Sequence, residues 1–139
     1  MVDKLRPKSV RSPGDPCAWA QETVGSISEL IEYTDVVDNA AMVLIGTIPA
    51  GARYLMADIK VITVFNSSNN DDAIVVGISG DTNYLIEDGH PDVADSETEG
   101  ELIDWTPTTD QLIYATHSST GTGPTTGKAI VTVRFKQPL

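Results

Sequence analysis

The 139-residue sequence contains few of the residues that build disulfides, metal centres and membrane spans. Its single cysteine, Cys17, can form neither an intrachain disulfide nor a thiolate zinc site. No hydrophobic run approaches the roughly 18 residues of a membrane-spanning helix, and the N-terminus lacks the hydrophobic segment of a signal peptide. We therefore expect a disulfide-free domain that forms inside a cell and contacts no membrane.

Positive charge is also scarce, with 9 Lys and Arg against 20 Asp and Glu and a net charge of −11. Because such a surface repels nucleic acid, we expect no nucleic-acid partner. The charge is uneven, since residues 1–11 hold four cations and one acid, whereas residues 81–110 hold ten acids and no cation. The chain thus resembles a short basic arm joined to an acidic body.

Pro13, Gly14 and Pro16 follow the basic segment and interrupt any regular element. We therefore divide the chain into an N-terminal arm and linker, residues 1–21, and one domain, residues 22–139. The arm is either a frayed terminus or a segment that orders on an acidic partner surface, such as a neighbouring copy. On the second interpretation, the contacting residues are Lys4, Leu5, Arg6, Lys8, Arg11 and Trp19.

The rest of the chain is rich in β-strand patterns. Hydrophobic and polar residues alternate along residues 128–135. Ala129, Val131, Val133 and Phe135 form the hydrophobic face, and Ile130 is the one hydrophobic residue on the polar face. Residues 111–116 form a shorter β-rich run, and the glycine-rich residues 117–127 between the two runs predict a loop. We expect the two runs to form an antiparallel hairpin with a long loop.

A second strand is predicted over residues 53–65, where Ile62 and Val64 make the far end hydrophobic on both faces and predict that it is covered. Residues 73–78 form the next strand, and 23–33, 42–47, 84–86 and 102–105 are further candidates. Helical turns are alternatives at 28–32 and 38–44. The fold class predicted is all-β, an antiparallel sandwich. The predicted core contains Val61, Phe65, Val76, Ile78, Val131 and Val133.

Catalytic patterns are hard to find. His90 and His117 both lie in loop-like sequence, and neither has a partner at metal or catalytic spacing. Ser79 lies in a Gly-Ile-Ser-Gly stretch. A nucleophile elbow needs a glycine two residues after the serine, whereas here the glycine follows the serine directly. We predict that the protein is not an enzyme and that these three residues are dispensable for function.

The acidic run 81–104 raises the question of calcium, because hard cations need several oxygen ligands. Asp81 and Asn83 stand at alternate positions, but the glycine and glutamate of an EF-hand loop are absent. A solvated acidic loop is the favoured interpretation, and no cofactor is expected. Trp105 is expected in the core, with an exposed stacking aromatic as the alternative.

A family resemblance rests on the order of several strand and turn sequences. These are Gly46–Gly51, Val64–Asn66, Val76–Asp81 with Tyr84 and Leu85, and Thr126–Phe135. Over residues 42–135 this order resembles small virion structural proteins of tailed bacteriophages, the jelly-roll capsid decoration (cement) and fibre-type modules. The resemblance implies a jelly roll that assembles as a homo-oligomer, often a trimer, outside a capsid or along a tail.

The sequence therefore favours a non-enzymatic structural protein of a phage particle, made in the host cytoplasm. The first hypothesis is a capsid cement protein on the capsid exterior, with copies of itself and a major capsid protein as partners. The alternatives are a tail or head-fibre component that binds a host glycan and a free carbohydrate-binding sandwich. An exposed aromatic platform around Trp105 favours a glycan-binding protein, whereas a buried Trp105 with an arm that extends to a neighbouring copy favours cement.

Overall fold

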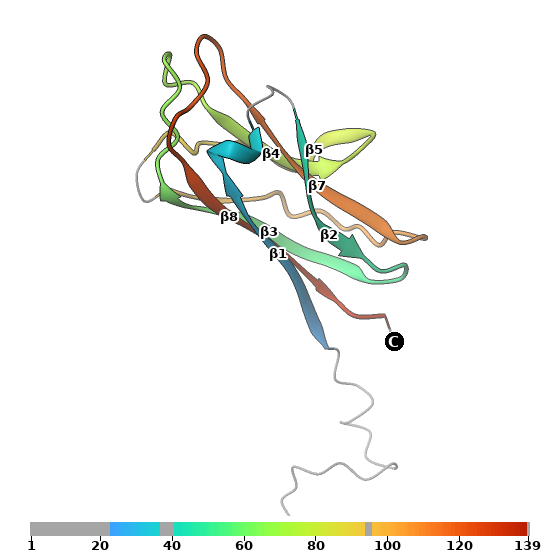
Figure 1. The fold of residues 1–139 in the computed structure, drawn as a ribbon. Coiled ribbons are helices and arrows are strands. Elements are labelled where there is room, and N and C mark those ends of the chain that lie inside the picture. The colour runs from blue at the N-terminus through green and yellow to red at the C-terminus, as the bar shows by residue number, and fades with distance from the viewer. Residues whose placement is uncertain (1–22, 37–40, 94–95, 139) are drawn as a thin grey trace, which may run out of the picture.

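The computed structural model describes residues 23–36, 41–93 and 96–138, which form a two-layered β-sandwich (Figure 1). Within these ranges the only helical element is a single 3-10 turn, so none of the described segments is a helix long and hydrophobic enough to cross a membrane. The elements are β1 (Val24–Glu32), η1 (Tyr33–Val36), β2 (Met42–Ile48), β3 (Arg53–Thr63), β4 (Ala73–Ile78), β5 (Asp81–Gly89), β6 (Glu97–Glu99), β7 (Gln111–Ser118) and β8 (Lys128–Lys136).

The strands form two four-stranded antiparallel sheets, in the orders β1-β8-β3-β6 and β2-β7-β4-β5. Successive strands mostly change sheets, and only the β4–β5 connection stays within one. Eight strands in this order make the two interlocked Greek keys of a jelly roll. The predicted all-β antiparallel sandwich is confirmed.

The C-terminal strand β8 shows how the sequence pattern determines the structure. It lies between β1 and β3, and its alternate residues Ala129, Val131, Val133 and Phe135 are buried, as predicted. Ile130 is half-buried on the opposite face, between Leu30 of β1 and Lys60 of β3. An inward row of small and branched side chains therefore fixes the register, because a one-residue slip would expose the whole row.

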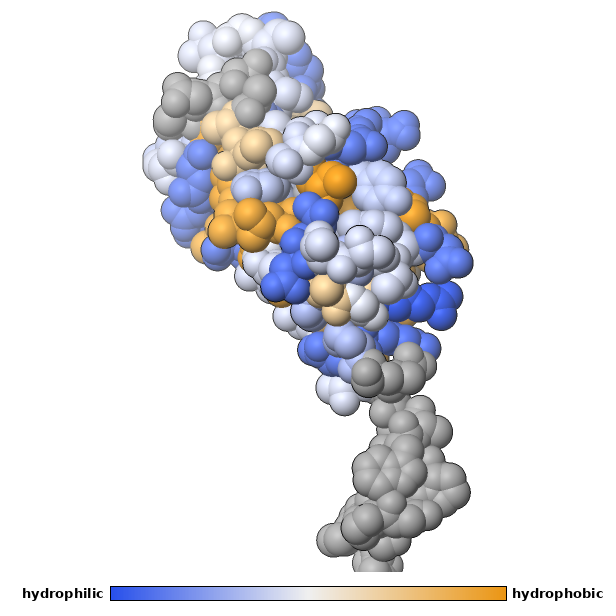
Figure 2. Space-filling view, turned by 90° about the vertical axis from the view of Figure 1, so that its right-hand side faces the viewer, coloured by the Kyte–Doolittle hydropathy of each residue, from blue (hydrophilic) through white to orange (hydrophobic). Residues whose placement is uncertain are grey.

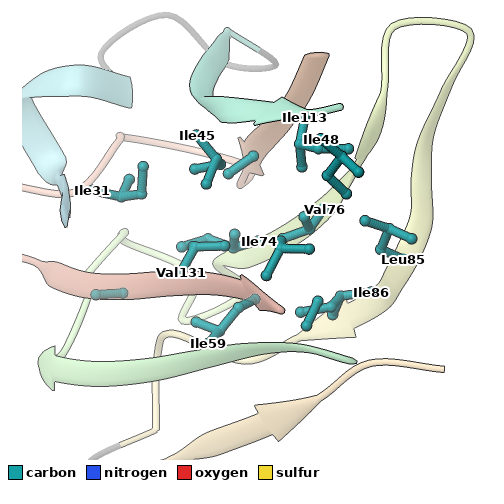
Figure 3. Packing of buried hydrophobic residues seen from close by; sticks show 14 of the residues in the cluster. Ile31, Ile45, Ile48, Ile59, Ile74, Val76, Leu85, Ile86, Ile113 and Val131 are labelled. Atoms are coloured by element: carbon teal, nitrogen blue, oxygen red, sulfur yellow. The ribbon is translucent and has the colours of Figure 1, made fainter. Parts of the chain in front are cut away.

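The core lies between the sheets (Figure 3). Ile45, Ile48 and Ile113 face it from β2 and β7, and Ile59 and Val131 face it from β3 and β8. Five of the six residues predicted for the core are buried, namely Val61, Phe65, Val76, Val131 and Val133. The sixth, Ile78, is only partly buried and packs against the edge of the cluster, because β4 ends there.

The predicted hairpin between residues 111–116 and 128–135 is wrong. β7 pairs with β2 and β4, whereas β8 pairs with β1 and β3 in the opposite sheet. The intervening loop therefore crosses the end of the sandwich instead of turning back within one sheet. Both strands have one buried face, so their alternation is the same in either arrangement.

The predicted strand over residues 102–105 is also wrong. The strand between β5 and β7 is β6, Glu97–Glu99, which ends before residue 102. Residues 100–107 nevertheless run along the edge of β3. The Tyr54 amide donates to the Trp105 carbonyl at 2.9 Å, and the Gly51 amide donates to the Pro107 carbonyl at 2.8 Å. These bonds are too widely spaced for a regular ladder, but they cover an edge that would otherwise be open.

The prediction that the end of β3 is covered on both faces fails at Ile62. The register of β3 against β8 shifts between Val61 and Thr63, which places Ile62 in a β-bulge. Its side chain is 53% exposed, whereas Val64 is half-buried. Upstream, residues 28–32 belong to β1 and not to a helical turn, and Met42 begins a strand.

Candidate assembly surfaces

The residues predicted to make assembly contacts, Lys4, Leu5, Arg6, Lys8, Arg11 and Trp19, lie outside the part of the chain that the structure describes. Cys17 lies outside it as well. The candidate site must therefore be built from the body. Four surfaces of the body differ in chemistry, namely the outer faces of the two sheets, a pair of loops at one end, and an aromatic cluster beside β3.

The strands of the β1-β8-β3-β6 sheet carry all five Lys and Arg residues of the described body, together with five acids. On its outer face Arg134 Nη1 lies 2.6 Å from Asp58 Oδ2, and Lys60 Nζ lies 3.7 Å from Glu97 Oε2. Between these pairs lies a shallow hollow of about 350 Å³. We call this surface the charged face, and its balanced charges make it strongly hydrated.

The other sheet presents a different surface, because β2, β4 and β7 contain no Asp, Glu, Lys or Arg. The register pairs Leu44 with Tyr114 on the outer side, and it aligns both Met42 and Val75 with Thr116. Leu112 pairs with Thr47 on the same side. We call the surface formed by Met42, Leu44, Val75, Leu112 and Tyr114 the apolar face. The sequence contained this signal in three charge-free strands, but the expected hairpin obscured it.

Two polar loops meet at one end of the sandwich, at the upper left in Figure 1. They are residues 64–72, between β3 and β4, and residues 119–127, between β7 and β8. Asn66 Oδ1 accepts hydrogen bonds from the amides of Thr125 and Thr126 at 2.7 and 2.9 Å, and the Ser68 amide donates to the Thr122 carbonyl at 3.0 Å. Each of these loops passes from one sheet to the other, and the hydrogen bonds join the two loops. We therefore call the pair the loop clasp.

A buried polar pair lies where the loop clasp meets β7. His117 Nε2 lies 2.7 Å from Asp72 Oδ1, and their side chains are 2% and 0% exposed. Asp72 also accepts the Ser67 amide at 2.9 Å, while the Phe65 ring stacks on the imidazole with centroids 5.6 Å apart. Since a carboxylate can only accept, Nε2 carries the proton of this bond, and Nδ1 is buried without a partner among the described residues.

The prediction that His117 is a loop residue without a partner is therefore wrong. It lies within β7 and points inward, following Ile113 and Ala115 on the same face. Period-2 alternation extended by two residues would have placed it there. Its partner Asp72 is 45 residues away in the sequence, so no local pattern identifies the pair. Its surroundings are those of a structural pair, enclosed by the core.

The outer part of the loop clasp is organised by Asp71. Its carboxylate accepts hydrogen bonds from the amide and hydroxyl of Thr120, and from the Ser67 hydroxyl at 3.3 Å. The bonds from Thr120 lower the pKa of Asp71 below its ordinary value, because they stabilise the charged carboxylate. This exposed acid is thus tied to a loop 49 residues away.

The remaining candidates for chemistry are not brought together. His90 is exposed, and its Nε2 lies 3.4 Å from Asp88 Oδ2. Ser79 is exposed at the turn between β4 and β5. Within the described ranges, no group of three or more His, Cys, Asp or Glu side chains is arranged to hold a metal ion, and this includes the described part of the acidic run 81–104.

Trp105 belongs to a cluster of three aromatic residues. Its ring meets Tyr84 edge-on with centroids 5.3 Å apart, and Tyr54 at a tilt with centroids 6.3 Å apart. Tyr54 is buried, and this burial raises its pKa to about 12. Trp105 itself is partly buried and packs against the core. The mutually angled rings form a packed cluster and not the flat platform on which a sugar stacks.

No family model matches the sequence, and no curated protein matches it. The fold, however, is similar to chains in three phage capsid structures. In the capsid asymmetric unit of cyanophage Pam1 the match has a TM-score of 0.72 and 14% identity, covering 96% of this chain and 95% of the other.

The other two matches have TM-scores of 0.63 and 0.61, each at 15% identity. The first is in the acidic stable capsid of Helicobacter pylori bacteriophage KHP30 and covers 86% of this chain and 94% of the other. The second is in the capsid of Ralstonia phage GP4 and covers 86% of both chains. At these identities the likeness establishes a shared jelly-roll fold.

Proposed function

We propose that this chain is a non-enzymatic structural protein of a phage particle, and specifically a capsid cement protein that stabilises the head through contacts between subunits. The observation that carries the proposal is the likeness of the whole fold to chains in three phage capsid structures. The matches cover 86–95% of those chains. The likeness is therefore to entire chains of similar size within capsids, and not to one domain of a larger shell protein.

The surfaces of the body support an assembly role. A jelly roll stabilised from within leaves its outer faces free to differ, and here one face is charged and the other apolar. The angled aromatic cluster at Trp105 does not favour a glycan-binding platform. The proposed partners are further copies of this chain, which form a trimer, and a major capsid protein. The proposed location of this chain is the capsid exterior.

The proposal includes a role for the arm. Its four cations, Lys4, Arg6, Lys8 and Arg11, would lie near carboxylates of an adjacent subunit or of the capsid floor, and Leu5 and Trp19 would supply most of the affinity. The acids of the body that lie outside the charged face, in β5 and the loops, provide the complementary charge. Exposed ion pairs contribute only about 0–1 kcal/mol each and are screened by salt, so the cations would tune binding.

Electron microscopy of the particle that contains this chain tests the location. We expect density for the jelly roll on the outside of the head. Particles made without the protein should lose their genome at a lower temperature, and the purified protein should restore the heat resistance. Density on the tail or on a fibre would replace the cement role with the alternative, and absence of the protein from purified particles would overturn both.

A second experiment tests the arm. Deletion of residues 1–16 should weaken binding to cement-free particles and leave thermal unfolding of the body nearly unchanged. Replacing the four cations with alanine should cause a smaller loss, confined to low salt. If the truncated chain binds as tightly as the full chain, residues 1–16 make no contact with the particle.

A further inference from the structure

The apolar face brings its hydrophobic residues together on three neighbouring strands without a charge, whereas on the charged face Leu30 and Ile130 lie among charged side chains. Met42, Leu44 and Leu112 are 45%, 48% and 42% exposed, and the register brings them together with Val75 and Tyr114 across three adjacent strands. Figure 2 views the molecule from the side on which β2, β5 and β7 lie in Figure 1, and hydrophobic side chains are exposed there in several groups with polar side chains between them. Scattered exposed hydrophobic residues need no explanation, but a contiguous group indicates a contact surface.

Charge restricts what can cover this face. The chain has a net charge of −11, and every cation of the described body lies in the strands of the other sheet. Acids border the apolar face, with Asp110 directly before β7 and Glu87 on β5. Two copies that approach through their acidic loops therefore repel each other, whereas two apolar faces meet without placing like charges opposite one another.

We propose that the apolar face is the surface through which copies of this chain pack against one another, each copy using the same face. An uncharged and mainly flat sheet surface is complementary to itself, because no side chain on it needs an opposite charge. Packing two charged faces would instead require desolvation of the Arg134–Asp58 and Lys60–Glu97 pairs. Because a face that meets the same face of another copy closes a dimer, the inference concerns a pair of copies in free solution and is separate from the trimer of the proposed function.

The size of the face determines the strength of the contact. Three strands about 4.8 Å apart, with a rise of about 3.3 Å per residue, present roughly 300 Å² per copy. A pair of such faces buries less than the roughly 1,200 Å² of a stable standard interface. We therefore expect weak association in dilute solution that becomes complete where copies are concentrated, as they would be on a particle.

Salt distinguishes this contact from one made by the basic arm. Screening reduces repulsion between the acidic chains and leaves hydrophobic packing in place, so added salt should strengthen association through the apolar face. Association through ion pairs between the arm and the body should weaken instead. The two modes thus respond to the same variable with opposite signs.

The test is sedimentation velocity of the full chain from about 10 to 500 μM, at low and high NaCl. We expect the mean mass to rise from the monomer value of 14.9 kDa with concentration, and further with salt. Leu44→Glu and Leu112→Glu should each reduce the association constant at least tenfold. The matched control is Ile62→Glu, which places the same charge at an exposed isoleucine of the other sheet and should associate as the unaltered chain does.

A dimer that is lost in both apolar-face variants and kept in the control supports the inference. A chain that stays monomeric at all concentrations and salts overturns it, as does association that survives both variants or is lost equally in the control. Circular dichroism of each variant confirms that the sandwich is intact. None of these outcomes depends on a phage particle, so the inference can fail while the proposed capsid role stands.

Discussion

The two sheets share one design on the inside and differ on the outside. Toward the core, both present buried Ile, Val and Ala residues in period-2 alternation. Toward solvent, the strands of the β1-β8-β3-β6 sheet carry five cations and five acids, whereas β2, β4 and β7 carry none. The excess negative charge lies in β5 and in the loops.

This difference separates what holds the fold together from what the fold presents to partners. Burial of the inner rows stabilises both sheets in the same way, at about 25 cal/mol for each Å² of hydrophobic surface removed from water. The outer rows contribute little to that term, so their composition can be set by other requirements. A charged outer face favours hydration, and an uncharged one favours packing against another surface.

The largest expected effect comes from comparing a polar pair on the inside with one on the outside. Asp72→Ala should destabilise the fold by about 3 kcal/mol, because it leaves the His117 Nε2 proton and the Ser67 amide buried without an acceptor. Asp58→Ala removes the partly exposed pair with Arg134 and should cost less than about 1 kcal/mol. Urea denaturation of both variants measures the difference. Equal losses would show that the buried pair is no more important than the exposed one.

A second prediction concerns Gly127, the last residue of the loop clasp before β8 begins in the charged sheet. Gly127 has φ of 149°, and a Cβ there would lie 2.5 Å from the Phe65 ring. Gly127→Ala combines an unfavourable backbone conformation with overpacking and should cost about 2 kcal/mol. The control is Gly123→Ala in the same loop, where a Cβ would contact nothing within 4 Å. Thermal unfolding of the two variants should differ clearly, and similar melting temperatures would contradict the argument.

Alternation predicted the inner half of this molecule well, because burial of one face leaves a local period in the sequence. It identified the inward rows of β3 and β8, and together with the hydrophobic run in β4 it gave five core residues that are buried. It could not assign strands to sheets, since β7 and β8 have the same pattern whether they pair or face each other across the core. The resemblance to jelly-roll proteins supplied the topology that the pattern lacks.

The candidate site was less predictable, for two physical reasons. A β-bulge such as the one at Ile62 changes the face on which a residue lies, and the local sequence carries no sign of it. The His117–Asp72 pair and the loop clasp join residues 45 to 60 positions apart, so only the folded topology brings them together. The apolar face was present in the sequence as three charge-free strands, but it gains meaning only when they are known to be neighbours.

A third and smaller effect is expected on the apolar face. Thr116 lies in β7 between Met42 and Val75, and its hydroxyl oxygen is buried without a hydrogen-bond partner among the described residues. Thr116→Val replaces that hydroxyl with a methyl group of similar size and should stabilise the fold by about 1 kcal/mol. The control is Thr132→Val on the charged sheet, where the hydroxyl contacts Ser28 at 3.4 Å. A loss of stability at Thr116 would indicate a bonded hydroxyl.

The last and smallest effect concerns Asp71, which ties together loops that lead into the two sheets. Its folded pKa is lowered below the ordinary 3.8, chiefly by the hydrogen bonds from Thr120. A carboxyl group with a lowered folded pKa contributes stability above its unfolded pKa and loses it as the pH falls through the folded value. The contribution should therefore be fully present at neutral pH and be lost progressively as the pH falls below 3.8. Melting temperatures of the unaltered chain and of Asp71→Asn should differ slightly at neutral pH, and the difference should shrink as the pH falls below 3.8. Asp81→Asn controls for the loss of one charge. A gap that persists unchanged in acid would mean that Asp71 acts through its shape and not through its charge.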